Sequence, residues 1–382
     1  MWIHKRQGWP EFRWDVATLS PLLVEIRHQQ GLLLGRMASL GFSLQQEASL
    51  NTLTRDVVKS SAIEGENLNV GEVRSSIAKR LGMDIAGLPQ PSRHVEGIVE
   101  VMLDATQSCH TPLTEQRLFA WHSALFPTGF SGMYPIVVGE WRPPSAGAMQ
   151  VVSGALGRER VHFEAPEATR LPTEMAAFLA WFEQENNIDP VLKSGLAHFW
   201  FVTVHPFEDG NGRIARAIAD MALARADNTP QRFYSMSAQL EMERTTYYQQ
   251  LEQQQRNTLD VTRWLSWFLG CLGRAFANAE KALGAILHKS HVWERANQFP
   301  VNARQRLILN RMLDDFVGYM NTSKYAKLAK CSTDSALRDI RGLLEWGVFV
   351  QNSSGGRSTS YRLVTSEAIT ATPNIAPTPT SG

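Results

Sequence analysis

Hydrophobic residues recur at helical spacing through residues 1–95 of the chain. One run ends before Gly41, and a second ends near Gly65. The apolar positions of the two runs are Leu22, Leu23, Ile26, Leu33, Leu34, Met37 and Leu40, and then Leu50, Leu53, Val57 and Val58. Because apolar positions three or four residues apart line one face of a helix, the pattern predicts two helices, the first closed by Gly41. We therefore expect residues 1–95 to form a helical N-terminal region.

A longer block, residues 96–290, combines helical runs with one stretch of different character. The predicted helices span 115–126, 173–185, 191–204 and a run that begins near Gly212. Two short segments rich in valine, 149–153 and 160–163, flank a turn that contains Gly154 and Gly157. Such segments around a glycine-bearing turn predict a β-hairpin. The expected fold class is mainly α, a helical core with one small β-hairpin.

A third unit is predicted over residues 301–363. Its pattern predicts three helices followed by two short strands around a glycine-bearing turn. The corresponding segments are a helix marked by Leu307, Leu309 and Leu313, helices over 325–329 and 335–346, and strands over 348–350 and 361–363. The remaining tail, 364–382, is rich in Thr, Pro, Ala and Ser, and we expect it to be disordered.

Composition narrows the class of protein. The 382 residues include 38 Lys+Arg and 37 Asp+Glu, and 43% are hydrophobic. A net charge of +1 excludes a wholly basic nucleic-acid coat protein and an acidic solvating chain, although local patches can exist. Three scattered cysteines, Cys109, Cys271 and Cys331, argue against a disulfide framework or a zinc cluster. Without an apolar leader or spanning segment, we expect a soluble cytoplasmic protein with no membrane contact.

The segment from residue 205 to residue 216 has the features of a phosphate site. Gly210 and Gly212 allow a loop that opens into a helix, where free backbone N–H groups bind anions. Arg213 and Arg216 lie one helical turn apart, so both can face the same anion. Each feature alone has a commoner explanation, as a turn or as a solvated helix face. The coincidence of these features in one segment favours a functional phosphate site.

The same segment also offers a base and a metal ligand. His205 titrates near neutrality, and Asp209 supplies a hard oxygen of the kind that binds Mg²⁺ together with substrate phosphates. A lone histidine before proline usually carries no chemistry. Here it precedes an anion-binding pattern by a few residues, which favours a catalytic role.

The segment His205-Pro206-Phe207-Glu208-Asp209-Gly210-Asn211-Gly212-Arg213-Ile214-Ala215-Arg216 resembles the Fic signature HxFx(D/E)GNGRxxR, and every specified position matches. Resemblance to this family implies transfer of AMP from ATP to a hydroxyl side chain of a target protein. By position, His205 would be the base and Asp209 would hold Mg²⁺ against the α- and β-phosphates. Gly210, Asn211 and Gly212 would form the anion hole, with Arg213 on the distal phosphates. Catalysis would then consist mostly of positioning and charge neutralisation.

Two further segments resemble parts of Fic proteins. The predicted hairpin matches the flap that aligns a target peptide by strand addition, with Val151, Val152, Ser153 and Gly154 nearest the nucleotide. Tyr247 and Tyr248 are similar to the place where an aromatic residue lines the adenine pocket. A purely structural hairpin and two core tyrosines are the alternatives.

An upstream segment resembles the inhibitory pattern (S/T)xxxE(G/N) of the family. Ser60 and Glu64 are four residues apart, so a helix places them on one face, and Gly65 suits a helix C-terminus. By resemblance, Glu64 would pair with Arg216 and withdraw it from the γ-phosphate. A carboxylate in a triphosphate site also repels the nucleotide. The alternative is a helix-ending glutamate in solvent. Some Fic proteins use this glutamate to remove AMP, which leaves de-AMPylation open.

The two terminal modules carry less specific signals. The first eighty residues, with Trp2, Trp9 and Trp14, resemble a region often fused to bacterial Fic domains, and we expect it to pack on the core and present the inhibitory helix. Residues 301–363 resemble a winged helix-turn-helix, with ten Lys+Arg against five Asp+Glu. The basic residues singled out are Lys324, Lys327, Lys330, Arg338, Arg341 and, on the wing, Arg357. DNA binding and protein binding by this unit are nearly equal alternatives.

The sequence therefore predicts an autoinhibited protein adenylyltransferase that uses ATP and Mg²⁺. One alternative is a transcription regulator whose Fic-like core senses a nucleotide, although a sensor has no need of His205. Another is transfer of a different phosphate-containing group. The target protein is open, and so is a homodimer.

Overall fold

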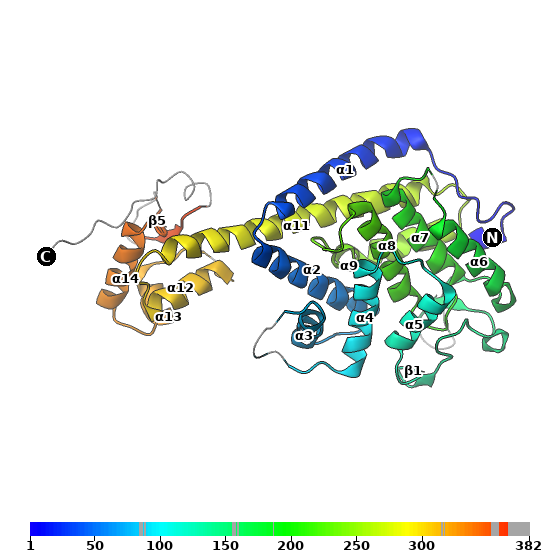
Figure 1. Cartoon of the computed structure of the whole chain (residues 1–382), viewed down its shortest axis with the longest axis horizontal. Coiled ribbons are helices and arrows are strands. Elements are labelled where there is room, and N and C mark those ends of the chain that lie inside the picture. Colours follow the sequence, from blue (N-terminus) through cyan, green and yellow to red (C-terminus); the bar gives the residue numbers. More distant parts are fainter. Residues whose placement is uncertain are drawn as a thin grey trace. The chain divides into compact units, whose positions relative to one another are not determined.

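A computed structural model describes the chain except residues 84–86, 88, 155–157, 159, 186, 315, 317, 353–358 and 366–382. The predicted tail, Gly157 of the hairpin turn and Arg357 of the wing therefore lie almost wholly outside the described residues. Contacts divide the chain into two compact units, residues 1–279 and 280–382, and the boundary falls inside helix α11 (Thr262–Ala296). Both units are mainly helical, as predicted (Figure 1).

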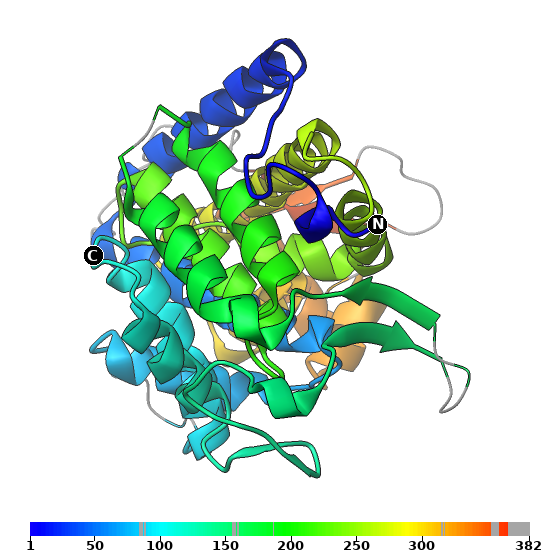
Figure 2. The same ribbon diagram turned by 90° about the vertical axis from the view of Figure 1, so that its right-hand side faces the viewer.

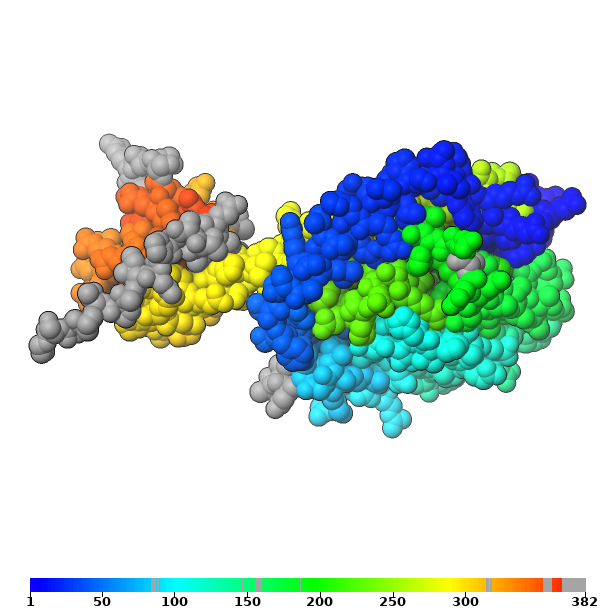
Figure 3. Space-filling model, turned by 45° about the horizontal axis from the view of Figure 1, so that its top comes forward, coloured from blue at the N-terminus to red at the C-terminus, as the bar shows by residue number. Residues whose placement is uncertain are grey.

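Unit 1 begins with the short 3-10 helix η1 (Ile3–Lys5) and five α-helices. These are α1 (Val16–Ala38), α2 (Phe42–Ile63), α3 (Val70–Arg80), α4 (Arg93–Gln107) and α5 (Glu115–Leu125). Helix α1 lies at the molecular surface (Figure 3) and buries only the stripe of side chains that faces the core. The buried residues of α1 are Leu19, Ile26, Gln30, Leu33 and Met37.

The boundary between α1 and α2 differs from the prediction. We expected Gly41 to close the first helix, but α1 ends at Ala38 and Gly41 is the N-cap residue of α2, with φ −60°. This φ is open to any residue, so Gly41 opens the second helix without the left-handed conformation of a C-terminal glycine. The prediction that α2 ends near Gly65 is confirmed.

The end of α2 is a Schellman motif. Gly65 has φ 85°, its amide donates to the Ala62 carbonyl (3.0 Å), and the Glu66 amide donates to the Ser61 carbonyl (3.0 Å). The motif stops the helix immediately before Glu64, the C-cap residue. The chain turns there, so the Glu64 side chain is fixed at a helix end.

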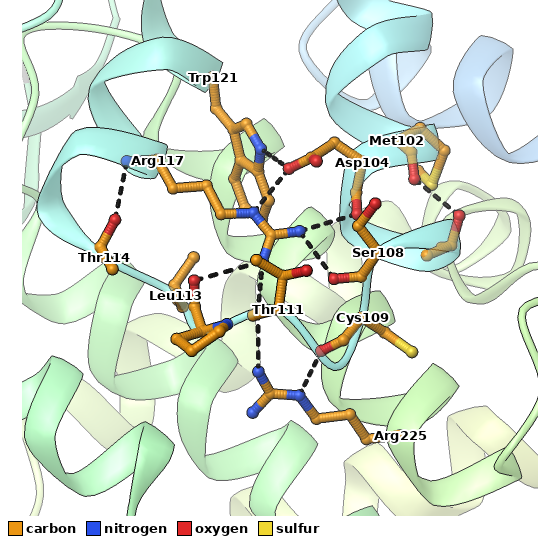
Figure 4. Close-up of polar contacts among 12 residues, drawn as sticks. Met102, Asp104, Ser108, Cys109, Thr111, Leu113, Thr114, Arg117, Trp121 and Arg225 are labelled. Carbon is orange, nitrogen blue, oxygen red and sulfur yellow. Dashed lines mark hydrogen bonds and ion pairs between the residues drawn. The ribbon is translucent and has the colours of Figure 1, made fainter.

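Helices α4 and α5 cross closely. A Cβ added to Gly97 would lie 1.9 Å from the Ala124 carbonyl oxygen, so only glycine permits this approach. The connection between the two helices is held by Arg117, which donates to the Asp104 carboxylate (2.7 Å) and to the Thr111 and Ser108 carbonyls (Figure 4).

The centre of unit 1 is formed by α7 (Pro190–Val204) and α8 (Asn211–Asp227), which pack on each other (Figure 1). Helix α7 is buried from Val191 to Val204 except at Lys193, because its sequence is apolar on all sides. Further helices surround this pair: η3 (Ala168–Arg170), α6 (Leu171–Glu183), α9 (Met236–Met242), α10 (Arg244–Gln255) and the first part of α11. The loop between α7 and α8 carries the motif of residues 205–216.

Two small hairpins stand beside this centre, together with the 3-10 helix η2 (Pro144–Ala146). Strands β3 (Gln150–Ser153) and β4 (Arg160–Glu164) form the predicted hairpin, which projects from the helices (Figure 2). Strands β1 (Phe130–Ser131) and β2 (Tyr134–Pro135) form a shorter hairpin that the sequence analysis did not predict.

After the last part of α11, unit 2 has the predicted order of three helices and a strand pair. Its elements are α12 (Ala303–Asp314), α13 (Thr322–Leu328), α14 (Thr333–Glu345), β5 (Phe349–Gln351) and β6 (Tyr361–Leu363). Its own hydrophobic core includes Ile308, Tyr325, Ile340 and Phe349. Among the helices that the structure describes, none has the length and hydropathy that a membrane crossing requires.

Candidate active site

Two residues with left-handed backbone shape the loop between α7 and α8. His205 follows the last residue of α7 with φ 52°, and Gly210 precedes the first residue of α8 with φ 80°. A Cβ at Gly210 would lie 2.8 Å from the Phe126 ring, so both the backbone conformation and the available space require glycine. The loop thus has His205 at one end and the free N–H groups of α8 at the other.

The side chain of Asn211 closes this loop. Its Oδ1 accepts from the Phe207 amide (2.9 Å), and its Nδ2 donates to the Phe207 carbonyl (2.8 Å). Both residues are buried, so the pair satisfies backbone groups that water does not reach. The Asn211 side chain is thereby committed to the loop, and any contact with an anion comes from its backbone N–H.

His205 has the protonation state of a base. Its Nδ1 lies 3.0 Å from the Val202 carbonyl, which can only accept, so the ring proton sits on Nδ1 and the lone pair on Nε2. Burial lowers the pKa of His205 below its usual value, and the nearby Arg142 guanidinium lowers it further. The imidazole is therefore neutral at pH 7.

Arg142 bonds to the backbone of the loop between α7 and α8. Its amide donates to the Pro206 carbonyl (2.9 Å), its Nε donates to the His205 carbonyl (2.9 Å), and its Nη2 donates to the Pro166 carbonyl. The Arg142 side chain is buried, and no carboxylate among the described residues forms an ion pair with it. Desolvation lowers its pKa. Arg142 thus fixes the backbone that carries His205.

Asp209 is half-buried and held from two sides. Its Oδ1 accepts from the Gly210 amide (2.6 Å), and its Oδ2 accepts from the Ser131 hydroxyl. No group of three or more Asp, Glu, His or Cys side chains suited to a metal exists among the described residues. A single accessible carboxylate fits Mg²⁺, which keeps waters and shares its remaining ligands with substrate phosphates.

His122 stands under the loop. Its ring stacks on Phe207 at 4.1 Å and 7°, its Nδ1 accepts from the Gly139 amide (3.2 Å), and its Nε2 lies 3.2 Å from the Asp209 carbonyl. Burial lowers the pKa of His122 to about 4, so the ring is neutral and donates from Nε2. It links α5 to the backbone of Asp209.

The structure brings Ser60 and Glu64 to Arg216. The Arg216 Nη2 lies 2.9 Å from Glu64 Oε1, its Nε donates to the Ser60 hydroxyl (2.9 Å), and Nη2 also donates to the Ser60 carbonyl (3.0 Å). The arginine side chain is 2% exposed and the glutamate side chain 35%. Although burial acts to lower the pKa of Arg216, the Glu64 carboxylate raises it, so the guanidinium is charged.

The Glu64 carboxylate also occupies the N-terminus of α8. A Cβ added to Gly212 would lie only 2.3 Å from Glu64 Oε1, which places this oxygen directly against the glycine. Backbone N–H groups at a helix N-terminus attract anions, and here the anion is a side chain of the protein. Glu64 therefore lies against both Arg216 and the first turn of α8.

Arg213 has a different partner from Arg216. Its Nη1 lies 3.2 Å from Glu66 Oε2, and its guanidinium stacks over the Phe126 ring at 5.0 Å. Glu66 also bonds to the His94 ring, and this bond lowers the pKa of the glutamate. Two carboxylates of one turn, Glu64 and Glu66, thus hold the two arginines of the motif.

The predicted flap residues lie on an exposed strand. All four residues of β3 are exposed, including Val151 (37%) and Val152 (48%), and Gly154 follows with φ 110°. Ser153 is tied to the other strand, because its hydroxyl lies 2.6 Å from His162 Nε2. The free edge of β3 is the edge not paired with β4.

The two predicted tyrosines of α10 differ in environment. Tyr247 is 1% exposed, and its hydroxyl lies 2.8 Å from Nε2 of the buried His198. Tyr248 is 39% exposed, and its hydroxyl donates to the Ile63 carbonyl (3.4 Å) at the end of α2. Only the ring of Tyr248 is accessible to a ligand.

Several residues that shape this site carried no local sequence signal. They are His94, His122, Ser131, Arg142 and Glu66. Each acts through a partner far away in sequence, for example Arg213 and Glu66, which are 147 residues apart. Of these residues, Glu66 alone lies beside a recognised motif, two residues after Glu64.

Two family models match the chain. One is described as the Fic/DOC family and covers residues 112–223, and the other is a domain of unknown function (DUF4172) over residues 2–83. The segment 205–216 lies inside the first match. The η1 segment and helices α1 to α3 lie inside the second.

Curated relatives match over about half of the chain. A protein of Caenorhabditis elegans named protein adenylyltransferase fic-1 is 26% identical over 195 residues, which is 49% of this chain and 36% of that protein. A protein of Drosophila grimshawi named protein adenylyltransferase Fic is 25% identical over 185 residues, 46% of this chain and 33% of that protein. The chain thus spans about a third of the length of these relatives.

Solved structures with a similar fold include one from a bacterium. A Fic domain-containing signaling protein from Bacteroides thetaiotaomicron matches 67% of this chain and 95% of its own, with a TM-score of 0.50 and 21% identity. At this identity the likeness concerns the fold of the helical core.

Proposed function

Residues 112–223 match the Fic/DOC family model, and from this premise we propose that the chain is an autoinhibited protein adenylyltransferase. It would transfer AMP from ATP to a Ser, Thr or Tyr hydroxyl of a target protein. The observation that carries the proposal is the neutral His205, whose free Nε2 stands at the loop that opens α8.

The proposed reaction is an in-line displacement at the α-phosphorus of ATP. The acceptor hydroxyl oxygen forms a bond to this phosphorus, the bond to the β-phosphate bridging oxygen breaks, and pyrophosphate leaves. The hydroxyl proton passes to His205 Nε2, which the Val202 carbonyl orients through Nδ1. Backbone N–H groups at Gly210, Asn211 and Gly212 would bind the phosphates as charge develops.

Asp209 would hold the Mg²⁺ that neutralises phosphate charge in this family of reactions. Its own geometry suits that role, since the Ser131 hydroxyl and the Gly210 amide fix the carboxylate without burying it. The exposed β3 strand, with Val151 and Val152, would pair with the acceptor peptide. Tyr248 would contribute to the adenine side of the site.

Autoinhibition rests on the position of Glu64. Its carboxylate pairs with Arg216 and abuts Gly212, so ATP and Glu64 compete for the same cation and the same helix end. Release of Glu64 would return Arg216 to the γ-phosphate. The Glu64 side chain is 35% exposed, so water can reach its carboxylate, and we include AMP removal in the same proposal.

The test is intact-mass and peptide mass spectrometry of the full chain incubated with ATP and Mg²⁺. Glu64→Gly should acquire an AMP adduct well above the wild-type level, and the double variant Glu64→Gly/His205→Ala should acquire none. Glu64→Gln separates loss of charge from loss of bulk. An adduct from UTP or a phosphocholine donor, with none from ATP, would redirect the proposal to another group transfer. Tight ATP binding without any adduct would favour the nucleotide sensor.

A second activity is proposed for unit 2, where several basic side chains are exposed. Lys327 on α13 and Arg338 and Arg341 on α14 are exposed and have no ion-pair partner among the described residues. We propose that this surface contacts nucleic acid. A gel shift with random duplex should weaken steeply with salt, and Arg338→Glu/Arg341→Glu should reduce both the affinity and the salt slope. If the duplex is not shifted at any salt concentration, a protein partner is favoured instead.

A further inference from the structure

The N-terminal segment Trp2–Arg6 lies against the β3–β4 hairpin, far from it in sequence. The Lys5 ammonium bonds to Glu164 Oε1 at 2.7 Å, across 159 residues. Trp2 meets the Phe163 ring edge-on at 5.4 Å, and His4 does so at 5.9 Å. Figure 2 shows the N-terminus and the hairpin on the same side of unit 1. We call residues Trp2–Arg6 the strap.

Within the hairpin, the strap contacts two residues of β4, Phe163 and Glu164, and Glu164 also bonds to β3. Glu164 receives Lys5 on one oxygen and the Gln150 amide group on the other (3.2 Å). Glu164 and Gln150 are the first register pair of the hairpin. The strap therefore contacts the base of the hairpin, where the register of both strands is set.

Arg256, the C-cap residue of α10, contacts both β4 and the strap. Arg256 donates to the Val161 carbonyl (2.9 Å) and to the His162 carbonyl (3.2 Å), and its guanidinium stacks on Trp2 at 4.9 Å. Arg6 in turn donates to the Asn257 carbonyl. Trp2 is thus packed between a β4 ring and the cation that binds the β4 backbone.

These contacts matter because a two-stranded hairpin is only marginally stable by itself. β3 is exposed along its length and pairs with β4, so its position depends on β4. The position of β4 depends on α10 and the strap. Helix η1 can serve in this way because Ile3 and His4 are buried and fix it to the core.

We propose that the strap is a positioning segment of the acceptor site. It would hold β4 so that the free edge of β3 stands ready for an acceptor strand, which lowers the entropy cost of pairing. This inference rests on the proposed function of the hairpin. It gives the start of the domain of unknown function a role separate from presenting Glu64.

The first measurement is amide hydrogen exchange in the full chain. The variant Trp2→Ala/Lys5→Met should increase exchange within residues 150–153 and 160–164 by roughly five- to thirtyfold, the equivalent of one aromatic pair and one exposed ion pair. Arg80→Met is the matched control, because it removes a partly exposed ion pair with Glu100 on α3 and α4. Unchanged exchange in the hairpin would overturn the proposal.

The second measurement separates positioning from general destabilisation. In the Glu64→Gly background, with the full-length His205→Ala chain as acceptor, the strap variant should raise the KM for the acceptor and leave the KM for ATP unchanged. An equal rise in both KM values, or faster exchange throughout α7 and α8, would mean a structural role only and would overturn the proposal. If Glu64→Gly forms no AMP adduct at all, the proposed function fails, and hydrogen exchange alone decides whether the strap holds the hairpin.

Discussion

Replacing Glu64 by glutamine removes one charge from the Arg216 pair and keeps the volume of the side chain. Arg216 is 2% exposed and would keep its two hydrogen bonds to Ser60 but lose the negative charge of its partner. Breaking a fully buried ion pair costs about 3–5 kcal/mol. Because the Glu64 side chain is 35% exposed, solvent screens the pair, and we expect a loss of about 1–2 kcal/mol.

The same change should create a nucleotide response. Without the competing carboxylate, phosphates can reach Gly212 and Arg216, and ligand at about a hundred times its Kd stabilises a protein by about 2.7 kcal/mol. Without nucleotide, the loss of about 1–2 kcal/mol should lower the unfolding temperature of unit 1 by about 2–6 °C in Glu64→Gln relative to wild type. With Mg²⁺ and ATP the variant should regain that loss, while the wild type should hardly respond.

Differential scanning calorimetry of the full chain, with and without Mg²⁺-ATP, measures both effects. Glu47→Gln is the control, because it weakens a partly exposed pair with Arg74 outside the site and should show no nucleotide response. The reasoning is refuted if wild type and Glu64→Gln gain the same stability from ATP. It is also refuted if glutamine costs no stability in the absence of nucleotide.

Four further outcomes are expected. Since burial lowers the pKa of His205, the acid limb of AMP transfer by Glu64→Gly should have its midpoint below pH 6.5 in a pH–rate profile, and a midpoint above it would contradict a neutral buried base. Gly212→Ala should abolish ATP-dependent stabilisation even beside Glu64→Gly, as calorimetry can check, because a Cβ fills the anion site. Gly97→Ala should cost about 3 kcal/mol in urea unfolding, since its Cβ would meet a backbone oxygen at 1.9 Å. Burial lowers the pKa of His198 to about 3, so the unfolded state binds more protons below pH 6.5 and stability should fall there by up to about 1.4 kcal/mol per pH unit, less so in His198→Gln.

Local patterns in the sequence predicted most of the secondary structure of this chain. Apolar periodicity marks α5, α6 and α7 to within about two residues, because each helix buries one face or its whole surface. The exception at Gly41 is instructive, since glycine is common at both ends of helices and only the backbone φ distinguishes them.

The contacts between distant segments could not be predicted in this way. Lys5 and Glu164 have no shared motif, and neither do Arg142 and His205. Adjacent tyrosines on a helix point about 100° apart, so one of Tyr247 and Tyr248 had to face the core, but the choice depends on His198 of α7. Such choices are made by packing, which a single sequence does not reveal.

Helix α10 connects the Glu64 turn with the β3–β4 hairpin. Arg244, Tyr248 and Glu252 of α10 recur every four residues and share one face. Tyr248 donates to the last carbonyl of α2, and Glu252 lies 2.7 Å from His162 Nδ1, whose other nitrogen meets Ser153. Tyr248 and Glu252 are one turn apart on a rigid element. A displacement of the Glu64 turn that moves Tyr248 would therefore act on the same helix that contacts β4 through Glu252.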